Sequence, residues 1–128
     1  MKNIGAAMNG GNGKREKGDE FFPTAEGTTR ALIPTLREIG WPNDVWENAC
    51  GAGHISKQLL AAGFNVFSSN LTDRGYGRIG VNFLSQDRPL APSIITNPPC
   101  SLSDEFLVHA QTILGIDHIA MLLPSGLY

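Results

Sequence analysis

The sequence contains little that would indicate a metal centre or a membrane protein. Its two cysteines, Cys50 and Cys100, match no zinc-ligand spacing and are expected to be free thiols in a reducing compartment. No apolar run approaches the length of a membrane-spanning helix, and residues 1–11 lack the apolar core of a signal peptide. We therefore expect a cytoplasmic protein with no metal site and no membrane contact.

An excess of positive charge is also missing. Ten lysines and arginines stand against 12 aspartates and glutamates, which gives a formal net charge of −2. Nucleic-acid-binding domains usually carry a basic face, so the overall charge gives no support for such a partner. It does not exclude one, because a local patch matters more than the sum.

The chain divides into a short arm and one domain. Residues 1–19 are rich in Gly, Asn and Lys and have no apolar face, which predicts a flexible arm. The basic residues Lys14, Arg15 and Lys17 fit a solvated tail better than a phosphate site. Residues 20–128 are long enough for one domain with a single core.

Apolar segments of two kinds alternate through residues 20–128. Amphipathic helices are expected from Thr24 to about Ile39, with Pro34 as a kink, over residues 54–63 and over residues 101–115. Their inward residues are expected to be Leu32, Leu36, Ile39, Ile55, Leu59, Leu60, Ala62, Leu102, Phe106, Ala110 and Ile113. Short apolar strands are expected at residues 44–50, 64–69, within 77–84, at 92–96 and at 118–124. Continuously apolar strands separated by helices indicate an α/β fold with a parallel sheet covered on both faces.

Polar and glycine residues follow the first of these strands. Glu47 precedes Gly51-Ala52-Gly53, and a Gly-x-Gly at a strand-to-helix turn lets the backbone approach a ligand closely. The third glycine of a dinucleotide fingerprint would fall at Ser56, inside the helix, so that fingerprint is poor. A carboxylate at Glu47 suits a cationic group better than a pyrophosphate.

Three segments resemble the class I S-adenosylmethionine-dependent methyltransferases, and more narrowly the small phage and prophage adenine-N6 DNA methyltransferases. They are EFFPTAEGTTRAL, VWENACGAGHIS and IITNPPCSLSDEF, and the resemblance covers about residues 20–123. It implies a Rossmann-like, doubly wound sheet with strand order 3-2-1-4-5. It also implies S-adenosylmethionine as cofactor, DNA as a partner, and a cytoplasmic location in a bacterium or a phage-infected cell.

The resemblance assigns roles to two groups of residues. The catalytic loop would be Asn97, Pro98, Pro99 and Cys100, in which the Asn97 side-chain oxygen and the Pro98 carbonyl accept hydrogen bonds from the target amine. The prolines would hold that geometry rigidly. The cofactor would be held by Thr24, Glu47, Ala49, Gly51, Gly53, Asn70 and Asn82.

The sequence departs from the family pattern at four positions. Cys100 stands where an aromatic residue normally stacks on the flipped-out base. Asn48 replaces a proline, and Asn70 and Asn82 replace acids near the cofactor ribose and adenine. Family members also continue through a further helix and an antiparallel strand pair, so the sheet is expected to lack its last strands.

Two other functions therefore stay open. One is a non-catalytic binding or inhibitor protein derived from a methyltransferase and acting on a protein partner. The other is methylation of RNA or of a protein glutamine. Because residues 118–123 would form an apolar sheet edge, we also expect a homodimer, or a complex with another protein, that covers this edge and buries Met121 and Leu123, with the symmetric dimer as the default.

Three further side chains have open or minor roles. His54 is expected on the surface at a helix start, and His109 is expected to face solvent. Tyr76 either packs over a cofactor or fills its own loop, and the sequence does not separate these alternatives.

Overall fold

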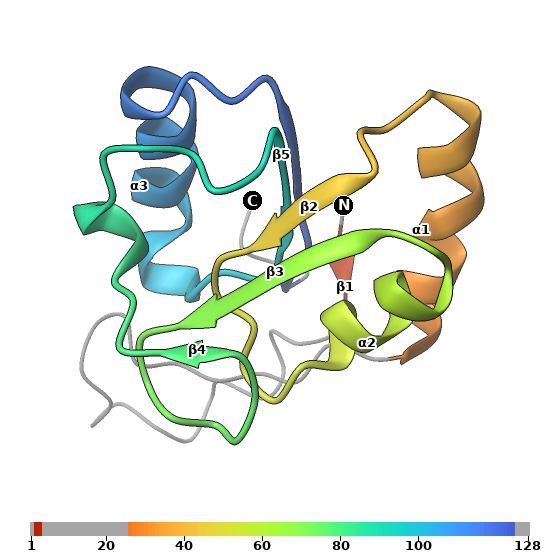
Figure 1. Ribbon diagram of the computed structural model, residues 1–128, viewed down its shortest axis with the longest axis horizontal. Coiled ribbons are helices and arrows are strands. Elements are labelled where there is room, and N and C mark those ends of the chain that lie inside the picture. Colours follow the sequence, from red (N-terminus) through yellow and green to blue (C-terminus); the bar gives the residue numbers. More distant parts are fainter. Residues whose placement is uncertain (1, 4–25, 125–128) are drawn as a thin grey trace.

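The computed structural model describes residues 2–3 and 26–124 (Figure 1). Its centre is a five-stranded sheet in the order β4-β3-β2-β5-β6, in which all neighbouring strands are parallel. The strands are β2 (Asp44–Glu47), β3 (Asn65–Asn70), β4 (Arg78–Ile79), β5 (Ser93–Thr96) and β6 (His118–Met121). When these five strands are numbered in chain order, the order across the sheet is the expected 3-2-1-4-5, which confirms the α/β, Rossmann-like prediction.

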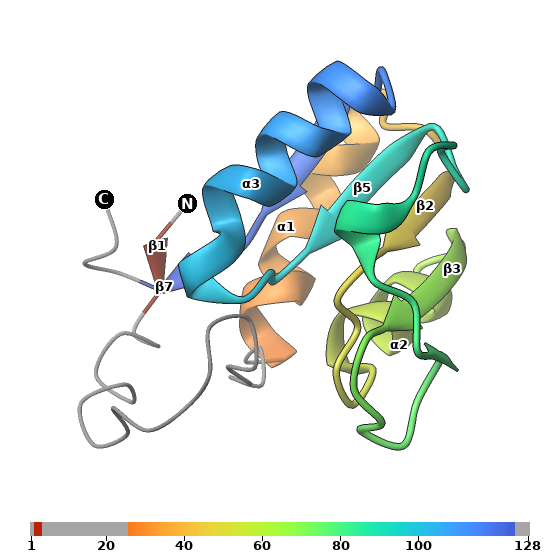
Figure 2. The same cartoon turned by 90° about the vertical axis from the view of Figure 1, so that its left-hand side faces the viewer.

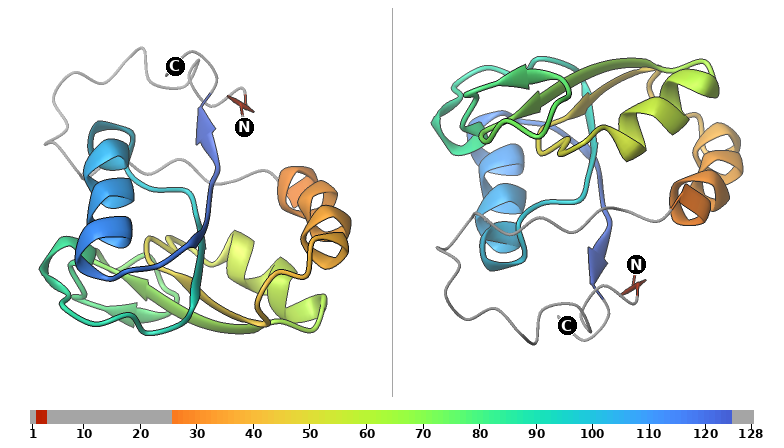
Figure 3. Two further views of the ribbon diagram at one scale, coloured as in Figure 1. Left: turned by 90° about the horizontal axis from the view of Figure 1, so that it is seen from above. Right: turned by 90° about the horizontal axis from the view of Figure 1, so that it is seen from below.

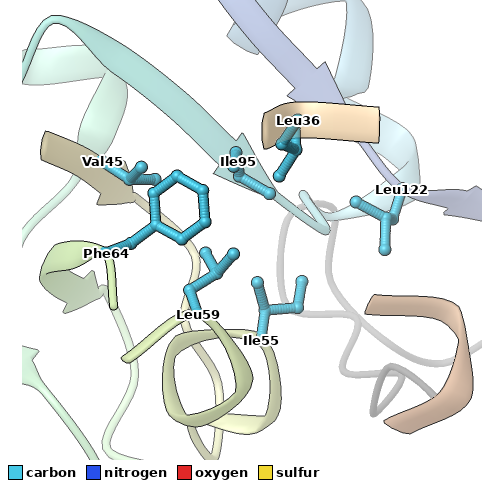
Figure 4. Packing of buried hydrophobic residues seen from close by; sticks show 7 residues of the cluster. All are labelled: Leu36, Val45, Ile55, Leu59, Phe64, Ile95 and Leu122. Carbon is cyan, nitrogen blue, oxygen red and sulfur yellow. The ribbon is translucent and has the colours of Figure 1, made fainter. Parts of the chain in front are cut away.

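Helices α1 (Glu26–Glu38) and α2 (His54–Ala61) cover one face of the sheet. Their apolar residues pack with inward residues of the strands in the first core cluster (Figure 4), which consists of Leu36, Val45, Ile55, Leu59, Phe64, Ile95 and Leu122. Pro34 lies inside α1, which is continuous. Thr24, the expected start of this helix, lies outside the described residues.

The opposite face is covered by α3 (Ser103–Val108) and by two short helical segments, η2 (Phe83–Ser85) and η4 (His109–Ile113). Figures 1 and 3 show α3 and α1 on opposite sides of the strands. The second core cluster on this face consists of Trp46, Phe83, Ile94, Phe106, Ala110, Leu114 and Ile116. Adjacent strand residues such as Ile94 and Ile95 belong to different clusters, as a strand with two buried faces requires.

Both helices on the first face end in the same way. In α1, Gly40 takes a left-handed φ of 73°, and Trp41 N donates to Leu36 O at 2.9 Å. In α2, Gly63 has φ 95° and Phe64 N donates to Leu59 O at 3.0 Å. This is the Schellman arrangement, and in each case the aromatic residue after the glycine packs into the first core cluster.

Two inward assignments on these helices are wrong. Ile39 is 61% exposed because the helix has ended at Glu38, and the left-handed turn that follows directs the chain away. Leu60 is 46% exposed because the buried face of α2 is centred on Ile55 and Leu59. At 100° per residue, Leu60 lies far from the middle of that face.

A third inward assignment is wrong for a different reason. The helix begun by α3 widens into a π-helical turn at η4, where Leu114 N donates to His109 O at 3.1 Å. A π-turn inserts an extra residue into the helix, so the inward position moves on by one. Leu114 is therefore buried at 6% exposure, while the expected Ile113 is 58% exposed.

The chain continues beyond β6 into β7 (Leu123–Pro124), which pairs in parallel with β1 (Lys2–Asn3). Leu123 is already buried within the single chain. The expectation that dimer formation buries Leu123 is therefore wrong, whereas Met121 is half-buried. No helix in the described ranges is both long and apolar enough to span a bilayer.

The π-turn gives a direct stability prediction. Leu114→Ala should lower the free energy of unfolding by about 2–4 kcal/mol, because it removes a buried side chain and leaves a cavity. Ile113→Ala should change it by less than about 0.5 kcal/mol, as for other exposed sites. Urea denaturation followed by circular dichroism measures both, and equal losses would contradict the π-helical register.

Candidate functional site

The carboxyl ends of the parallel strands bring the predicted site residues to one edge of the sheet. Glu47 ends β2, Asn70 ends β3, and Asn97 directly follows β5, while Asn82 follows β4 by three residues. Strands β2 and β5 are neighbours, and the order of the sheet reverses between them. This is the position at which open α/β sheets bind ligands.

The glycine turn, residues 49–53, joins β2 to α2 in a left-handed conformation. Gly51 has φ 54° and Gly53 has φ 90°, both of which disfavour any residue with a side chain. Cys50 N donates to Ser69 O at 2.9 Å, and Gly53 N donates to Cys50 O at 2.8 Å. The turn is thus fixed by its own backbone and by β3.

Glu47 supplies the helix cap that Gly53 cannot. Gly53 occupies the N-cap of α2 and makes no side-chain cap. Instead, Ser56 N donates to Glu47 Oε1 at 3.0 Å, and the Ser56 hydroxyl also bonds to this oxygen. Ser56 Oγ lies 2.6 Å from Ser68 Oγ, so a buried chain of polar groups links β2, α2 and β3.

Burial changes the acidity of two groups in this turn. Burial raises the pKa of Glu47 to about 8, against the opposing effect of the hydrogen bonds from Ser56. Burial, with a contribution from the negative charge of Glu47, raises the pKa of Cys50 to about 11. At neutral pH, Glu47 is therefore mostly protonated in the ligand-free chain and Cys50 is a thiol.

Tyr76 lies directly on the glycine turn. A β-carbon at Gly53 would come within 2.5 Å of the Tyr76 ring, and one at Gly77 within 2.8 Å of Cys50 Sγ. The Cys50 thiol donates to Tyr76 O at 3.5 Å. The close approach at position 53 is therefore made by the ring of Tyr76.

The Asn-Pro-Pro corner ends β5 as its sequence predicts. Pro98 is buried, and Asn97, Pro99 and Cys100 are half-buried. Leu102 N donates to Pro99 O at 2.9 Å, and Ser103 Oγ donates to Cys100 O at 3.2 Å, so the corner leads through η3 (Cys100–Leu102) into α3. These bonds anchor the corner on its η3 side, and on its β5 side Leu122 N donates to Thr96 O at 2.8 Å.

The two asparagines expected near the cofactor, Asn70 and Asn82, have local partners. Asn70 Nδ2 donates to Thr72 O at 2.7 Å, and Asn82 Oδ1 accepts from Leu84 N at 3.1 Å, which caps η2. Ala49 packs at the margin of the second core cluster. Thr24, the remaining expected cofactor residue, lies outside the described residues.

Two buried polar side chains at the switch point have no hydrogen-bond partner within the described structure. They are Asn48, through Oδ1, and Thr96, through Oγ1, and they are 3% and 1% exposed. Trp46 aligns with Ile94, and Asn48, one residue beyond the end of β2, and Thr96, the last residue of β5, each follow this pair by two positions. Because buried polar atoms are nearly always paired, this position suits the polar group of a ligand or an ordered water.

Sequence reasoning missed Ser56, Ser68 and the environment of His109. The prediction that His109 faces solvent is wrong: its ring is half-buried, with Nε2 at 2.7 Å from Gln86 O and the ring 5.2 Å from that of Phe83. His54, by contrast, is exposed at the first residue of α2, as expected. The role of Ser56 could have been predicted, because a serine at the start of a helix often takes part in capping.

Comparison with known proteins adds no assignment. No family model matches the chain, and no curated protein matches it.

The raised pKa of Glu47 predicts how stability depends on pH. At pH values between 4.5, the ordinary pKa of this group, and about 8, its pKa in the folded chain, folding takes up a proton. The stability associated with this group is therefore complete below pH 4.5 and is lost as the pH rises through 8. Glu47→Gln removes this titration and should gain stability relative to the wild type between pH 5 and 9, on the order of a few kcal/mol. Chemical denaturation across this range measures it, with Glu38→Gln on the exposed face of α1 as control. If the difference in unfolding free energy between Glu47→Gln and the wild type stayed constant from pH 5 to 9, the raised pKa of Glu47 would be contradicted.

The unpartnered hydroxyl of Thr96 gives a second prediction. Thr96→Val keeps the shape of the side chain and removes a buried polar group, so the ligand-free chain should gain about 1 kcal/mol in unfolding free energy. Ser93→Ala is the matched control, because its hydroxyl donates to Asp44 O at 2.9 Å, and it should lose about 1 kcal/mol. Thermal denaturation distinguishes the two, and destabilisation by Thr96→Val would show that the hydroxyl is satisfied.

Proposed function

We propose that the chain is an S-adenosylmethionine-dependent methyltransferase-like protein of the adenine-N6 type. The observation that carries the proposal is the placement of the glycine turn and the Asn-Pro-Pro corner at the ends of adjacent strands, β2 and β5, where the sheet order reverses. Each motif alone has an ordinary structural explanation. Their juxtaposition at the ligand-binding edge is what a two-substrate transfer reaction needs.

The residues present are compatible with a polar, cationic cofactor beside the turn. Asn48 and Thr96 carry buried polar atoms without partners at this edge, and Glu47 supplies a carboxyl group. Glu47, Ala49, Gly51 and Gly53 would hold the cofactor, with Asn70 and Asn82 nearby along the same edge. S-Adenosylmethionine, when bound, supplies an electrophilic methyl group on a positively charged sulfur.

The target amine would be activated at the corner after β5. An exocyclic amine conjugated to a purine is a poor nucleophile, because its lone pair is delocalised into the ring. Hydrogen bonds from its two protons to Asn97 Oδ1 and to the Pro98 carbonyl would localise that lone pair on nitrogen. The prolines and the hydrogen bonds that anchor Pro99 and Cys100 fix the positions of these acceptors.

A non-catalytic binding protein is the second candidate, and specific observations favour it. Cys100 offers no stacking face, and Glu47 is already used as the cap of α2. The Asn70 amide nitrogen is likewise bonded within its own loop. These contacts weaken the expected grip on the cofactor and on a flipped base. The same fold would then serve to bind a partner without methyl transfer.

Labelled cofactor tests the proposed reaction. The wild-type chain incubated with methyl-labelled S-adenosylmethionine should label DNA in preference to RNA or protein. Asn97→Ala should reduce labelling by roughly 100-fold or more, because one of two acceptors is lost, while cofactor affinity by calorimetry stays within about twofold. Asn65→Ala, at the opposite end of β3, is the control and should leave labelling unchanged.

Three outcomes would change the assignment. Cofactor binding without labelling of any substrate would favour the non-catalytic protein. Labelling of RNA or of a glutamine side chain would replace DNA as the substrate. No heat at millimolar cofactor would remove the methyltransferase assignment altogether.

A further inference from the structure

The loop between β3 and β4 gathers positive charge around Tyr76. Lys57, Arg74 and Arg78 are half of the lysines and arginines whose side chains the structure describes, the others being Arg30, Arg37 and Arg88. All three lie within the segment from Gly53 to Ile79, which holds a single acid, Asp73. In a chain of net charge −2, this is a strong local excess of one sign.

Lys57 and the start of α2 lie beside the Tyr76 ring, and the two arginines lie within two residues of Tyr76 along the chain. The Tyr76 ring packs on Gly53 at the start of α2, and Lys57 Nζ from the next turn of α2 lies 5.2 Å from the ring centroid. Arg74 and Arg78 flank Tyr76 in sequence, and Arg78 opposes Ser69 across β3 and β4. Figures 1 and 2 show this loop beside the start of α2.

The backbone of the loop is open at Gly75. Gly75 has φ 85°, and no heavy atom lies within 4 Å of the position a β-carbon would take there. Gly75 N donates to Asp73 Oδ1 at 2.9 Å, so the one acid in the segment is used to shape the loop. Apart from its chain neighbours Arg74 and Tyr76, no described residue therefore crowds the main chain at Gly75.

We propose that this surface, formed by Lys57, Arg74, Tyr76 and Arg78, binds the sugar–phosphate backbone of a nucleic acid. Arginine presents a planar fork that suits phosphate oxygens, and lysine adds a compact point charge. The half-buried ring of Tyr76 lies at the centre of the charges, where an unpaired base can stack. Such contacts hold and orient a strand without reading its sequence.

The identity of the partner rests on the proposed function, which supplies a nucleic-acid substrate. The surface lies beside the glycine turn, because Tyr76 contacts both Gly53 and Cys50. A strand held here would pass the carboxyl edge of the sheet. The surface would thereby supply part of the substrate binding that a separate recognition region provides in other enzymes of this type.

An anionic membrane is the alternative partner that the same region raises. Leu71 and Ile79, at the ends of β3 and β4, are 56% and 46% exposed. Membrane-surface binding usually requires a broad apolar face on an amphipathic helix, and two side chains at strand ends do not provide one. The glycine-flanked arginines and the central aromatic favour the nucleic acid.

Fluorescence anisotropy with labelled DNA of about 20 base pairs or nucleotides, without cofactor, tests the surface. Lys57→Ala and Arg78→Ala should each weaken binding roughly three- to tenfold, and each should reduce the slope of log affinity against log salt by about 1. Arg88→Ala, an exposed arginine in the loop after η2, is the control of equal charge and should have a clearly smaller effect. Tighter binding of the single strand than of the duplex is the expected order if Tyr76 stacks on a base.

Several results would overturn the inference. They are the absence of DNA binding by the wild type at about 50 mM salt, equal losses in Arg88→Ala and Arg78→Ala, and binding to phosphatidylserine vesicles but not to DNA. The outcome is separable from that of the proposed reaction. DNA binding is measured here without cofactor, so its weakening in Lys57→Ala and Arg78→Ala does not depend on whether any methyl group is transferred. A chain that binds DNA through Lys57 and Arg78 but methylates nothing would keep this surface and lose the enzyme.

Discussion

The hydrogen bonds between Glu47 and Ser56 hold the central part of this structure together. Helix α2 has only eight residues and begins at a glycine that has no side chain to cap it. Glu47, from the end of β2, accepts the bonds that Gly53 cannot and so fixes the start of α2 against the sheet. Ile55 and Leu59, which flank Ser56 on this helix, pack in the first core cluster.

This attachment has an electrostatic cost that affects the site. A carboxyl group with 1% exposure loses its hydration, which raises its pKa to about 8 and leaves it mostly neutral at pH 7. A neutral carboxyl still accepts the bonds from Ser56, so the fold tolerates the proton. A cationic ligand beside Glu47 would favour the ionised form, and under the proposed function cofactor binding and proton release would then be coupled.

Several features of the fold were predictable from particular residues. The apolar runs of β2 and β5 indicated buried parallel strands, and Gly40-Trp41 and Gly63-Phe64 marked helix ends because glycine alone takes the left-handed turn without strain. The outward positions of Ile39 and Leu60 were not predictable from spacing alone. They depend on where the helix stops and on which side of it the sheet lies. Ile113 and Leu114 exchanged roles because a single π-turn moved the helical register, and no local pattern in the sequence announces such a turn.

The sequence by itself determined which residues meet at the edge of the sheet, because the carboxyl ends of parallel strands must lie together. The order of strands and helices in the sequence is therefore enough to place Glu47, Asn70 and Asn97 at the same edge of the sheet. Only the tertiary structure decided what each of them does there. Glu47 caps α2 and Gly53 packs against the ring of Tyr76. Asn48 Oδ1 and Thr96 Oγ1 have no hydrogen-bond partner among the described residues. Those outcomes depend on hydrogen bonds and ring contacts between segments 9 to 48 positions apart, and such contacts exist only once the chain has folded.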